Sequence, residues 1–202
     1  MTLPTIRVLV PVADGSEDIE LCCITDILTR AGVAVTVASV MPEGRLQVTL
    51  ARNLKLVADT HIDHLLGSPD EDRRFDAMFL PGGMPGAALL GRSAALMHLL
   101  VDHVGQKRLY GAICAAPAVA LGPNNLLAGV ERATCFPALK DKFPTGVVWV
   151  DEPVVLSGLC LTGQGPAAAM AFALSAAAAL VGHQKAVDIS NSMLFNPLAI
   201  VG

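Results

Sequence analysis

The sequence predicts an α/β fold in which a mostly parallel β-sheet is packed between helices. Apolar runs typical of strands alternate with helical patterns from residue 6 to residue 113, and such alternation favours right-handed βαβ units. Hydrophobic residues make up 53% of the chain and aromatic residues only 4%, a composition typical of parallel strands between alanine-rich helices. The 202 residues suffice for one well-covered core, so we expect a single domain over residues 1–202.

The first unit of the fold begins with an apolar strand, Ile6–Val12. The stretch Asp14–Gly32 then predicts a helix, because Ser16 is suited to cap it, acidic residues occupy its first turn and Gly32 ends it. Val33–Val40 follows as a second buried strand.

Three shorter features come next. The stretch Leu46–Val57 holds two short β-like runs around the letters ARN, which predicts a hairpin or an excursion at the sheet edge. His61–Leu66 has the pattern of a short helix, and the charged run Asp70–Arg74 is typical of a solvated loop.

The sheet continues with a strand, Phe75–Leu80, that ends abruptly at the turn Pro81–Gly83. A helical pattern covers Ser93–Gly105, and Leu109–Ile113 is the next strand. These elements complete the alternation on which the predicted parallel sheet depends.

Charge and hydropathy exclude several classes of partner. The net charge is −4 at pH 7, so the chain lacks the basic surface that nucleic acids or anionic membranes bind. The one candidate for a membrane span, Pro166–Val181, is mostly alanine and is shorter than the roughly 20 residues that cross a bilayer. We expect a buried helix there, and neither nucleic acid nor membrane as a partner.

The amino terminus and the cysteines indicate a reducing compartment. Ile6–Ala13 is apolar but short, and acidic residues rather than a cleavage site follow it. The five cysteines form no CxxC pair and no even framework, which argues against a disulfide scaffold or a zinc site. We therefore expect a cytoplasmic protein with free thiols and no bound metal.

Three features fall at the carboxyl ends of predicted strands, where parallel sheets bind their ligands. They are the helix start Gly15–Glu20, the turn Pro81–Gly83 and the residue Cys114. We expect them to meet at one site.

Cys114 lies where a strand is predicted to turn into a helix. Ala112 and Ala116 stand two positions before and after it, and a nucleophile elbow requires small residues there. Pro117 suits the first turn of a following helix, whose amino end would favour a thiolate. A cysteine that only fills a buried space fits this window equally well.

The turn after Leu80 could complete such an elbow. Glycines at a strand end let a backbone N–H face a developing oxyanion, and the amides of Gly83 and Ala115 would form a pair. Taken alone, a Pro-Gly-Gly turn is usually no more than a turn.

Glu20 shares a helical face with Ile24, Ile27, Leu28 and Ala31 at spacings of three and four. If that face is buried, desolvation raises the pKa of the Glu20 carboxyl, which could then donate a hydrogen bond to a thiolate. The alternative is a side chain at the polar edge of the helix.

No motif places a histidine beside Cys114, although a Cys–His dyad would need one. Solvated or capping roles are expected for all five histidines. They are His61, His64, His98, His103 and His183. A Cys–Glu pair is the arrangement that remains.

Five motifs, spread over nearly the whole chain, resemble one family. They are GSEDIE at Gly15–Glu20, LPGG at Leu80–Gly83, AICAAP at Ala112–Pro117, PALKDK at Pro137–Lys142 and TGQGP at Thr162–Pro166. In this order they resemble the ThiJ/PfpI superfamily, in the Parkinson disease protein 7 (protein deglycase) branch and closest to its bacterial-type members.

The resemblance implies a role for each matching position. Cys114 would be the oxidation-sensitive nucleophile, Glu20 would hydrogen-bond it, and the amides of Gly83 and Ala115 would form an oxyanion hole. Further residues expected at the pocket, two of them arginines near an anion site at a dimer interface, are Glu17, Gly82, Phe136, Gly165, Pro166, Arg30 and Arg52.

One position departs from part of the family. Some members have histidine before the proline of the PALKDK motif, where this chain has Phe136. Because that histidine is a proposed acid/base partner, Glu20 would carry more of the proton transfer here. The neighbouring Cys135 would be either a second redox thiol or a packing residue.

The family resemblance also implies an architecture and a function. It implies a flavodoxin-like three-layer sandwich, a nucleophile elbow like that of class I glutamine amidotransferases, a homodimer and no cofactor. The implied activity is that of a cysteine-dependent glyoxalase or protein deglycase, acting on methylglyoxal or its early adducts, with an oxidative-stress response through Cys114. A non-enzymatic redox-sensing chaperone and a peptidase or amidotransferase-like hydrolase stay open as alternatives.

Overall fold

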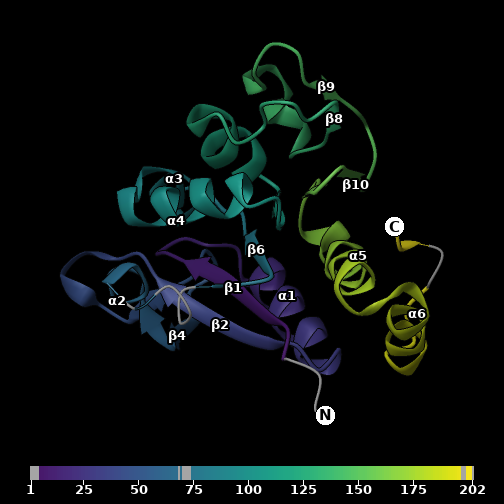
Figure 1. The fold of residues 1–202 in the computed structure, drawn as a ribbon, viewed down its shortest axis with the longest axis horizontal. Coiled ribbons are helices and arrows are strands. Elements are labelled where there is room, and N and C mark those ends of the chain that lie inside the picture. Colours follow the sequence, from purple (N-terminus) through teal and green to yellow (C-terminus); the bar gives the residue numbers. More distant parts are fainter. Residues whose placement is uncertain (1–4, 68, 70–73, 197–198, 202) are drawn as a thin grey trace.

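The computed structural model describes residues 5–67, 69, 74–196 and 199–201, and its centre is a seven-stranded sheet (Figure 1). The strand order is β10-β11-β7-β6-β1-β2-β5. All neighbouring pairs in this sheet are parallel except β10 and β11. The strands are β1 Arg7–Val12, β2 Ala34–Ser39, β5 Thr60–His61, β6 Ala77–Leu80, β7 Leu109–Ile113, β10 Val154–Ser157 and β11 Cys160–Gly163. The predicted mostly parallel sheet is confirmed.

Helices cover both faces of the sheet (Figure 1). Helix α5 packs against α1 and α6 on one face, and α4 contacts α2 and α3 on the other. The helices are α1 Asp18–Arg30, α2 Ile62–Gly67, α3 Gly86–Arg92, α4 Ala94–Gly105, α5 Ala169–Val181 and α6 His183–Ser192. The architecture is therefore the flavodoxin-like three-layer sandwich.

The alanine-rich stretch forms the buried helix that the sequence predicts. A short 3₁₀ turn, Pro166–Ala168, leads into α5, and nine side chains of that helix are buried. Phe172 of α5 meets Phe79 of β6 edge to face, with ring centroids 5.7 Å apart. No helix among the described residues is long and apolar enough to cross a membrane.

Two small two-stranded sheets stand beside the central one. They are the antiparallel pair β3 Gln47–Thr49 and β4 Lys55–Val57, and the parallel pair β8 Arg132–Ala133 and β9 Val148–Trp149. The first pair is the predicted hairpin. The Gly15 N–H donates to Thr49 O and the Ala51 N–H donates to Ser16 O, both at 2.8 Å. These bonds hold the hairpin against the segment that precedes α1.

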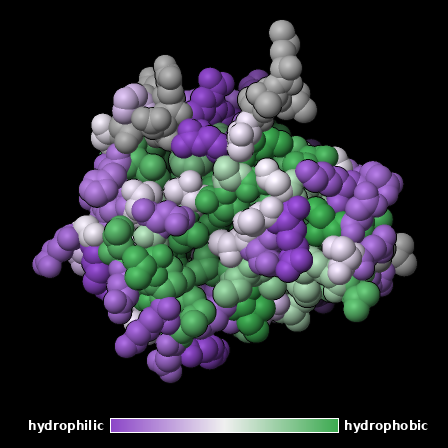
Figure 2. Space-filling view, turned by 90° about the horizontal axis from the view of Figure 1, so that it is seen from below, coloured by the Kyte–Doolittle hydropathy of each residue, from purple (hydrophilic) through white to green (hydrophobic). Residues whose placement is uncertain are grey.

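The surface mixes hydrophilic side chains with hydrophobic patches, as the view from below shows (Figure 2). Several large apolar side chains are more than half exposed, among them Ile19 at the start of α1 and Met84 after β6. Scattered exposed apolar residues are ordinary, but those around a pocket can mark a binding surface.

The cap of α1 differs from the prediction. Glu17, not Ser16, caps the helix, because its carboxylate accepts the Glu20 N–H at 2.9 Å. Ser16 is turned back toward β1, where its Oγ accepts the Ala13 N–H at 3.1 Å. The left-handed turn at Gly15 (φ +78°) accounts for this orientation. The predicted loop Asp70–Arg74 lies outside the described residues except for Arg74.

Candidate active site

The predicted site features meet at the switch point of the sheet. In the sheet, β2 lies on one side of β1, whereas β6 and then β7 lie on its other side. Ligands bind beyond the carboxyl ends of the strands where the strand order reverses in this way. Glu20 follows β1, Gly82 follows β6 and Cys114 follows β7. The topology therefore brings a carboxylate, a glycine turn and a thiol together.

Cys114 occupies a strained turn directly after β7. Its φ is +62°, a left-handed conformation that costs about 1 kcal/mol for a residue with a side chain. Two backbone bonds hold it there: Cys114 N–H donates to Gly163 O at 2.9 Å, and Phe136 N–H donates to Cys114 O at 2.8 Å. Ala112 and Ala116 are fully buried, so the small residues that an elbow requires are in place.

The close approach of three segments requires glycine after β6. A Cβ on Gly82 would lie 2.5 Å from the Cβ of Cys114 and 2.9 Å from Oε2 of Glu20. Gly83 has a φ of +84°, and a Cβ there would collide with the backbone oxygen of Gly15. The Pro-Gly-Gly turn therefore lets a carboxylate and a sulfur reach the same stretch of backbone.

Glu20 is completely buried on α1, as the predicted apolar face requires. Its Oε2 accepts the Gly82 N–H at 2.7 Å, whereas Oε1 has no hydrogen-bond partner among the described residues. Burial is the main cause that raises the pKa of the Glu20 carboxyl to about 7; the Gly82 bond opposes it and the charge of Glu17 adds to it. This carboxyl group can exchange a proton near neutral pH.

Burial also raises the pKa of the Cys114 thiol, to about 12, and the charge of Glu20 contributes to the rise. The backbone N–H groups of Gly83 and Ala115 lower the same pKa through hydrogen bonds to the sulfur. A helical segment does follow Cys114, as a π-helical turn, Pro117–Leu121, and a 3₁₀ turn, Gly122–Asn124. Burial outweighs the amide hydrogen bonds, so the thiolate that the sequence predicts is not the favoured form. The resting site holds a thiol beside a carboxyl group.

A pocket of about 390 Å³ opens on Cys114, and its wall is mostly apolar. The lining residues are Glu17, Ala51, Arg52, Gly83, Met84, Cys114, Ala115, Phe136, Ala138, Leu139 and Pro166. Phe136 is 45% exposed, and a Cβ on Gly165 would lie 3.7 Å from its ring. Gly165 therefore sits behind Phe136, and Phe136 presents an aromatic surface where some family members have histidine.

Of the residues predicted for the site, only Arg30 lies elsewhere. It ends α1, its side chain is half exposed, and its Nε lies 2.6 Å from Oδ2 of Asp26. Ten helical residues after Glu20 correspond to about 15 Å along the helix axis, so one chain cannot bring Arg30 to the pocket. Arg52 does line the pocket, and its N–H donates to Oδ2 of Asp18 at 2.8 Å.

Four lining residues were not predicted from the sequence: Ala51, Met84, Ala138 and Leu139. Each is adjacent to a predicted site residue or lies in the PALKDK motif. Position beside a motif is the only signal that could have indicated them, because none carries a reactive group.

Two histidines have structural roles that differ from the prediction. His61 and His103 are buried rather than solvated. The Nε2 atom of His61 lies 2.6 Å from Met41 O, and that of His103 lies 2.7 Å from Leu109 O. Buried imidazoles need such partners. No histidine is among the described residues that line the pocket of Cys114.

Cys135 is buried beside the pocket but does not line it. Its Sγ–H donates to the neighbouring Phe136 O at 3.4 Å, and burial raises the pKa of its thiol to about 11. The geometry favours the packing alternative for this cysteine.

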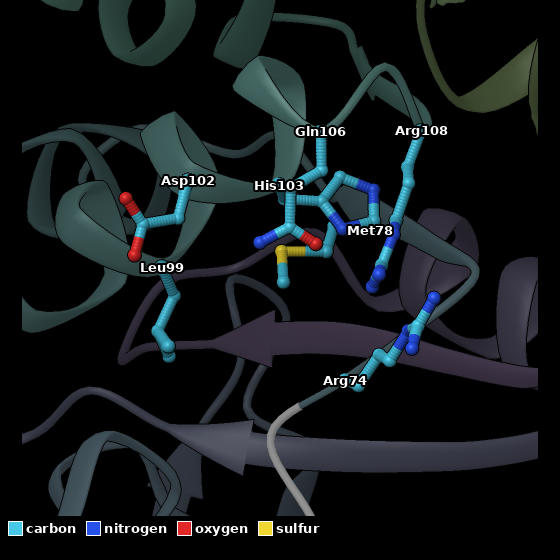
Figure 3. A pocket seen from close by; sticks show the side chains of 7 residues that line it. All are labelled: Arg74, Met78, Leu99, Asp102, His103, Gln106 and Arg108. Atoms are coloured by element: carbon cyan, nitrogen blue, oxygen red, sulfur yellow. The ribbon is translucent and has the colours of Figure 1, made fainter. Parts of the chain in front are cut away.

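A larger pocket, of about 540 Å³, lies at the opposite ends of the strands (Figure 3). Its lining residues are Arg74, Met78, Leu99, Asp102, His103, Gln106 and Arg108. These residues stand at the amino ends of β6 and β7 and on α4, and they include no thiol or hydroxyl nucleophile. The reactive site is therefore the smaller pocket.

Comparison with known proteins finds relatives over nearly the whole chain. The DJ-1/PfpI family profile matches residues 6–179. The chain is 36% identical over 197 residues to protein DJ-1 homolog B of Arabidopsis thaliana, covering 98% of this chain and 43% of that protein. It is 34% identical over 194 residues to the glutathione-independent glyoxalase DJR-1.2 of Caenorhabditis elegans, covering 96% of this chain and 95% of that protein.

Length and structure place these likenesses in context. The chain spans less than half the length of the plant relative but nearly all of the nematode one. The solved structure of oxidized DJ-1 from Toxoplasma gondii superposes with a TM-score of 0.87 at 38% sequence identity, covering 95% of this chain and 99% of that one.

Proposed function

This chain belongs to the DJ-1/PfpI family, and on that premise we propose that it is a cysteine-dependent glyoxalase and protein deglycase. Its substrates would be methylglyoxal and the early adducts of methylglyoxal with protein side chains. One observation carries the proposal: the Cys114 sulfur faces the amides of Gly83 and Ala115 beside a Glu20 carboxyl whose pKa is about 7. The nematode relative, a glutathione-independent glyoxalase, supports the glyoxalase assignment.

The first step uses the resting thiol. As the Cys114 sulfur bonds to the aldehyde carbon of methylglyoxal, the thiol proton passes to the carboxylate of Glu20, so no free thiolate has to form. The aldehyde oxygen gains negative charge, and the amides of Gly83 and Ala115 are placed to donate hydrogen bonds to it. Glu20 then delivers the thiol proton to this oxygen, so the product is a hemithioacetal on Cys114 and the Glu20 carboxylate is restored.

The second step is a proton shift followed by hydrolysis. A proton leaves the former aldehyde carbon and one is delivered to the neighbouring ketone carbon, which gives the lactate thioester of Cys114. Glu20 is the buried group suited to carry these protons, because its pKa of about 7 matches neutral conditions. Water cleaves the thioester, so methylglyoxal and one water become lactate with the thiol restored.

Loss of the thiol tests this function directly. We expect Cys114→Ala to lower methylglyoxal consumption and lactate formation by at least about 1000-fold, as removal of a nucleophile does in other enzymes. Cys22→Ser is the matched control, since Cys22 is an exposed free thiol on α1 outside the pocket. A wild-type protein that leaves methylglyoxal unchanged, or a Cys114→Ala variant as active as the wild type, contradicts the proposal.

Oxidation of Cys114 is a second proposed property of the same site. The amides of Gly83 and Ala115 and a protonated Glu20 surround the sulfur, and these donors would stabilise the oxygens of a sulfinate. Mass spectrometry after mild peroxide treatment should find Cys114 as the first oxidised cysteine. Earlier oxidation of the exposed Cys22 would contradict this. Suppression of aggregation only by the oxidised protein, without turnover, would favour the redox-sensing chaperone.

We also propose that the chain forms a single domain and acts as a homodimer. Ile19 and Leu54 are 53% and 48% exposed near the start of α1 and the hairpin, and a second copy could cover them and present its Arg30 to the pocket. Light scattering on the purified protein should give twice the chain mass. A monomer at micromolar concentration contradicts the proposal.

The proposed location is the cytoplasm. All five cysteines are described and all are free thiols, which is typical of proteins in a reducing compartment. Cell fractionation with an antibody against the protein tests this location, and recovery in an oxidising compartment contradicts it.

A further inference from the structure

Two guanidinium groups come together in the larger pocket at the amino ends of β6 and β7. Figure 3 shows the side chains of Arg74 and Arg108 reaching into the same space. The Arg108 Nη1–H donates to Phe75 O at 2.9 Å, which holds that guanidinium in place. Burial and the charge of Arg74 lower the pKa of Arg108, so the two guanidinium groups interact electrostatically. Like charges at this range repel.

The charge of Asp76 offsets part of this repulsion, since it raises the pKa of Arg108, but no described carboxylate forms an ion pair with either arginine. Neither Arg74 nor Arg108 lies within 4 Å of a described Asp or Glu oxygen. Three other arginines do have such partners. The pairs are Arg30 with Asp26 at 2.6 Å, Arg45 with Asp14 at 2.7 Å and Arg132 with Glu152 at 2.7 Å. Among the residues that the structure describes, the arginine pair in the larger pocket therefore has no ion-pair partner of the kind that these three arginines have.

Two described carboxylates near the pocket, those of Asp102 and Asp76, each contact another group. Asp102 lines the pocket, but its Oδ2 lies 3.6 Å from Nε2 of His98, and Figure 3 shows its side chain apart from the two arginines. Oδ2 of Asp76 accepts the Arg7 N–H at 2.8 Å. An anion from solution would fill the space that these carboxylates leave.

We propose that this pocket binds a small organic phosphate whose phosphoryl group bridges Arg74 and Arg108. A phosphate monoester carries close to two negative charges at pH 7, which balances two guanidinium groups, and its oxygens match the fork of N–H donors on each arginine. The side chains of Met78 and Leu99 give an apolar wall for the carbon part of the ligand, and Gln106 adds a neutral polar group. A volume of about 540 Å³ accommodates a small metabolite.

Calorimetric titration at constant ionic strength tests the proposal, with inorganic phosphate, phenyl phosphate and benzoate as probes. Constant ionic strength keeps general screening from mimicking binding. Phenyl phosphate should bind with a Kd of about 1 mM or tighter, more tightly than inorganic phosphate because its ring contacts Met78 and Leu99. It should bind at least about tenfold more tightly than benzoate, which has the same ring but one negative charge.

Arginine variants show which pocket the probe occupies. Arg74→Gln and Arg108→Gln should each weaken phenyl phosphate binding by about tenfold. Arg74 is exposed, so its variant keeps the test valid even if Arg108→Gln, which loses the bond to Phe75 O, is unstable. Arg92→Gln, an exposed arginine on α3, is the matched control.

Several outcomes overturn the proposal. They are no binding by the wild type, equal binding of benzoate and phenyl phosphate, and unchanged affinity in Arg74→Gln. Loss of binding in Arg52→Gln instead would assign the anion to the pocket of Cys114. None of these outcomes bears on methylglyoxal turnover, so the glyoxalase proposal stands or falls separately.

Discussion

Two pockets lie at opposite ends of the strands of the same mostly parallel sheet, and they are built in different ways. At the carboxyl ends, the pocket of Cys114 depends on backbone: a left-handed cysteine, a glycine turn with no room for a Cβ and a buried carboxyl. At the amino ends, the pocket of Arg74 and Arg108 depends on charged side chains from unstrained positions. Covalent chemistry requires that the fold hold the reacting groups in one precise geometry. Binding of an anion requires only positively charged side chains that can contact it.

The largest expected effect separates proton transfer from thiol reactivity. Glu20→Gln removes the charge that raises the pKa of the Cys114 thiol and removes the proton carrier as well. We expect methylglyoxal turnover to fall by about 100-fold or more, while iodoacetamide alkylates Cys114 faster at pH 8 because more thiolate is present. Assays of methylglyoxal consumption measure the first effect, and mass spectrometry of the alkylated Cys114 peptide measures the second.

Asp26→Asn, an exposed acid on the same helix, is the control for that variant and should change neither rate. Turnover that is unaffected in Glu20→Gln would show that the carboxyl group is only a structural feature. The two pockets would then no longer differ by the presence of a proton carrier.

A second variant tests the backbone of the smaller pocket. Gly82→Ala places a methyl group 2.5 Å from the Cβ of Cys114, so we expect a loss of about 2 kcal/mol in the free energy of unfolding and displacement of the thiol with loss of turnover. Gly105→Ala at the end of α4, where a Cβ would meet nothing within 4 Å, should shift stability by less than about 0.5 kcal/mol. Urea denaturation measures both, and equal stabilities would contradict the tight fit.

Stability against pH tests the buried carboxyl. The pKa of Glu20 is raised in the folded protein to about 7, so between about pH 4.5 and 7 the folded state binds more protons than the unfolded one. The contribution of Glu20 is therefore most favourable below pH 4.5 and is lost as the pH rises through 7, by about 3 kcal/mol in total.

Glu20→Gln should flatten this slope, measured as the difference between variant and wild type in urea denaturation at pH 5, 6 and 7. A slope that is identical in wild type and variant would contradict a raised pKa. Arg74→Gln, which alters the other pocket, should leave the slope unchanged.

The smallest expected effect concerns the apolar wall of the reactive pocket. Phe136→Ala removes an aromatic surface 45% exposed beside Cys114, so kcat/KM for phenylglyoxal should fall by about tenfold, with a smaller change for methylglyoxal. Val57→Ala, an exposed apolar residue on β4, should change neither substrate. Equal losses for both substrates would show that Phe136 does not contact the substrate side chain.

Local patterns were enough to predict much of the site. The spacing of Glu20 with apolar neighbours predicts a buried carboxyl, and small residues around Cys114 predict an elbow; both follow from periodicity and steric size, which are local properties. Helix α3 was not predicted, because seven residues with a glycine at Gly86 and another at Gly91 carry a weak helical signal. Strands β10 and β11 were also not predicted. They pair with each other, and β11 joins the sheet only through β7, which is distant in sequence.

The sequence by itself predicted the mostly parallel α/β sandwich and the meeting of three motifs at its strand ends, because alternation and spacing act over short segments. The proposed roles of Cys114 and Glu20 rest on the family resemblance, since local patterns left an alternative open for each residue. Only the tertiary structure decided the proton balance of the site. The pKa of Cys114 rises rather than falls because burial, which depends on the whole packed core, outweighs the hydrogen bonds from the Gly83 and Ala115 amides. The same long-range packing places Arg74, before β6, and Arg108, before β7, in one pocket. No local pattern indicates this juxtaposition.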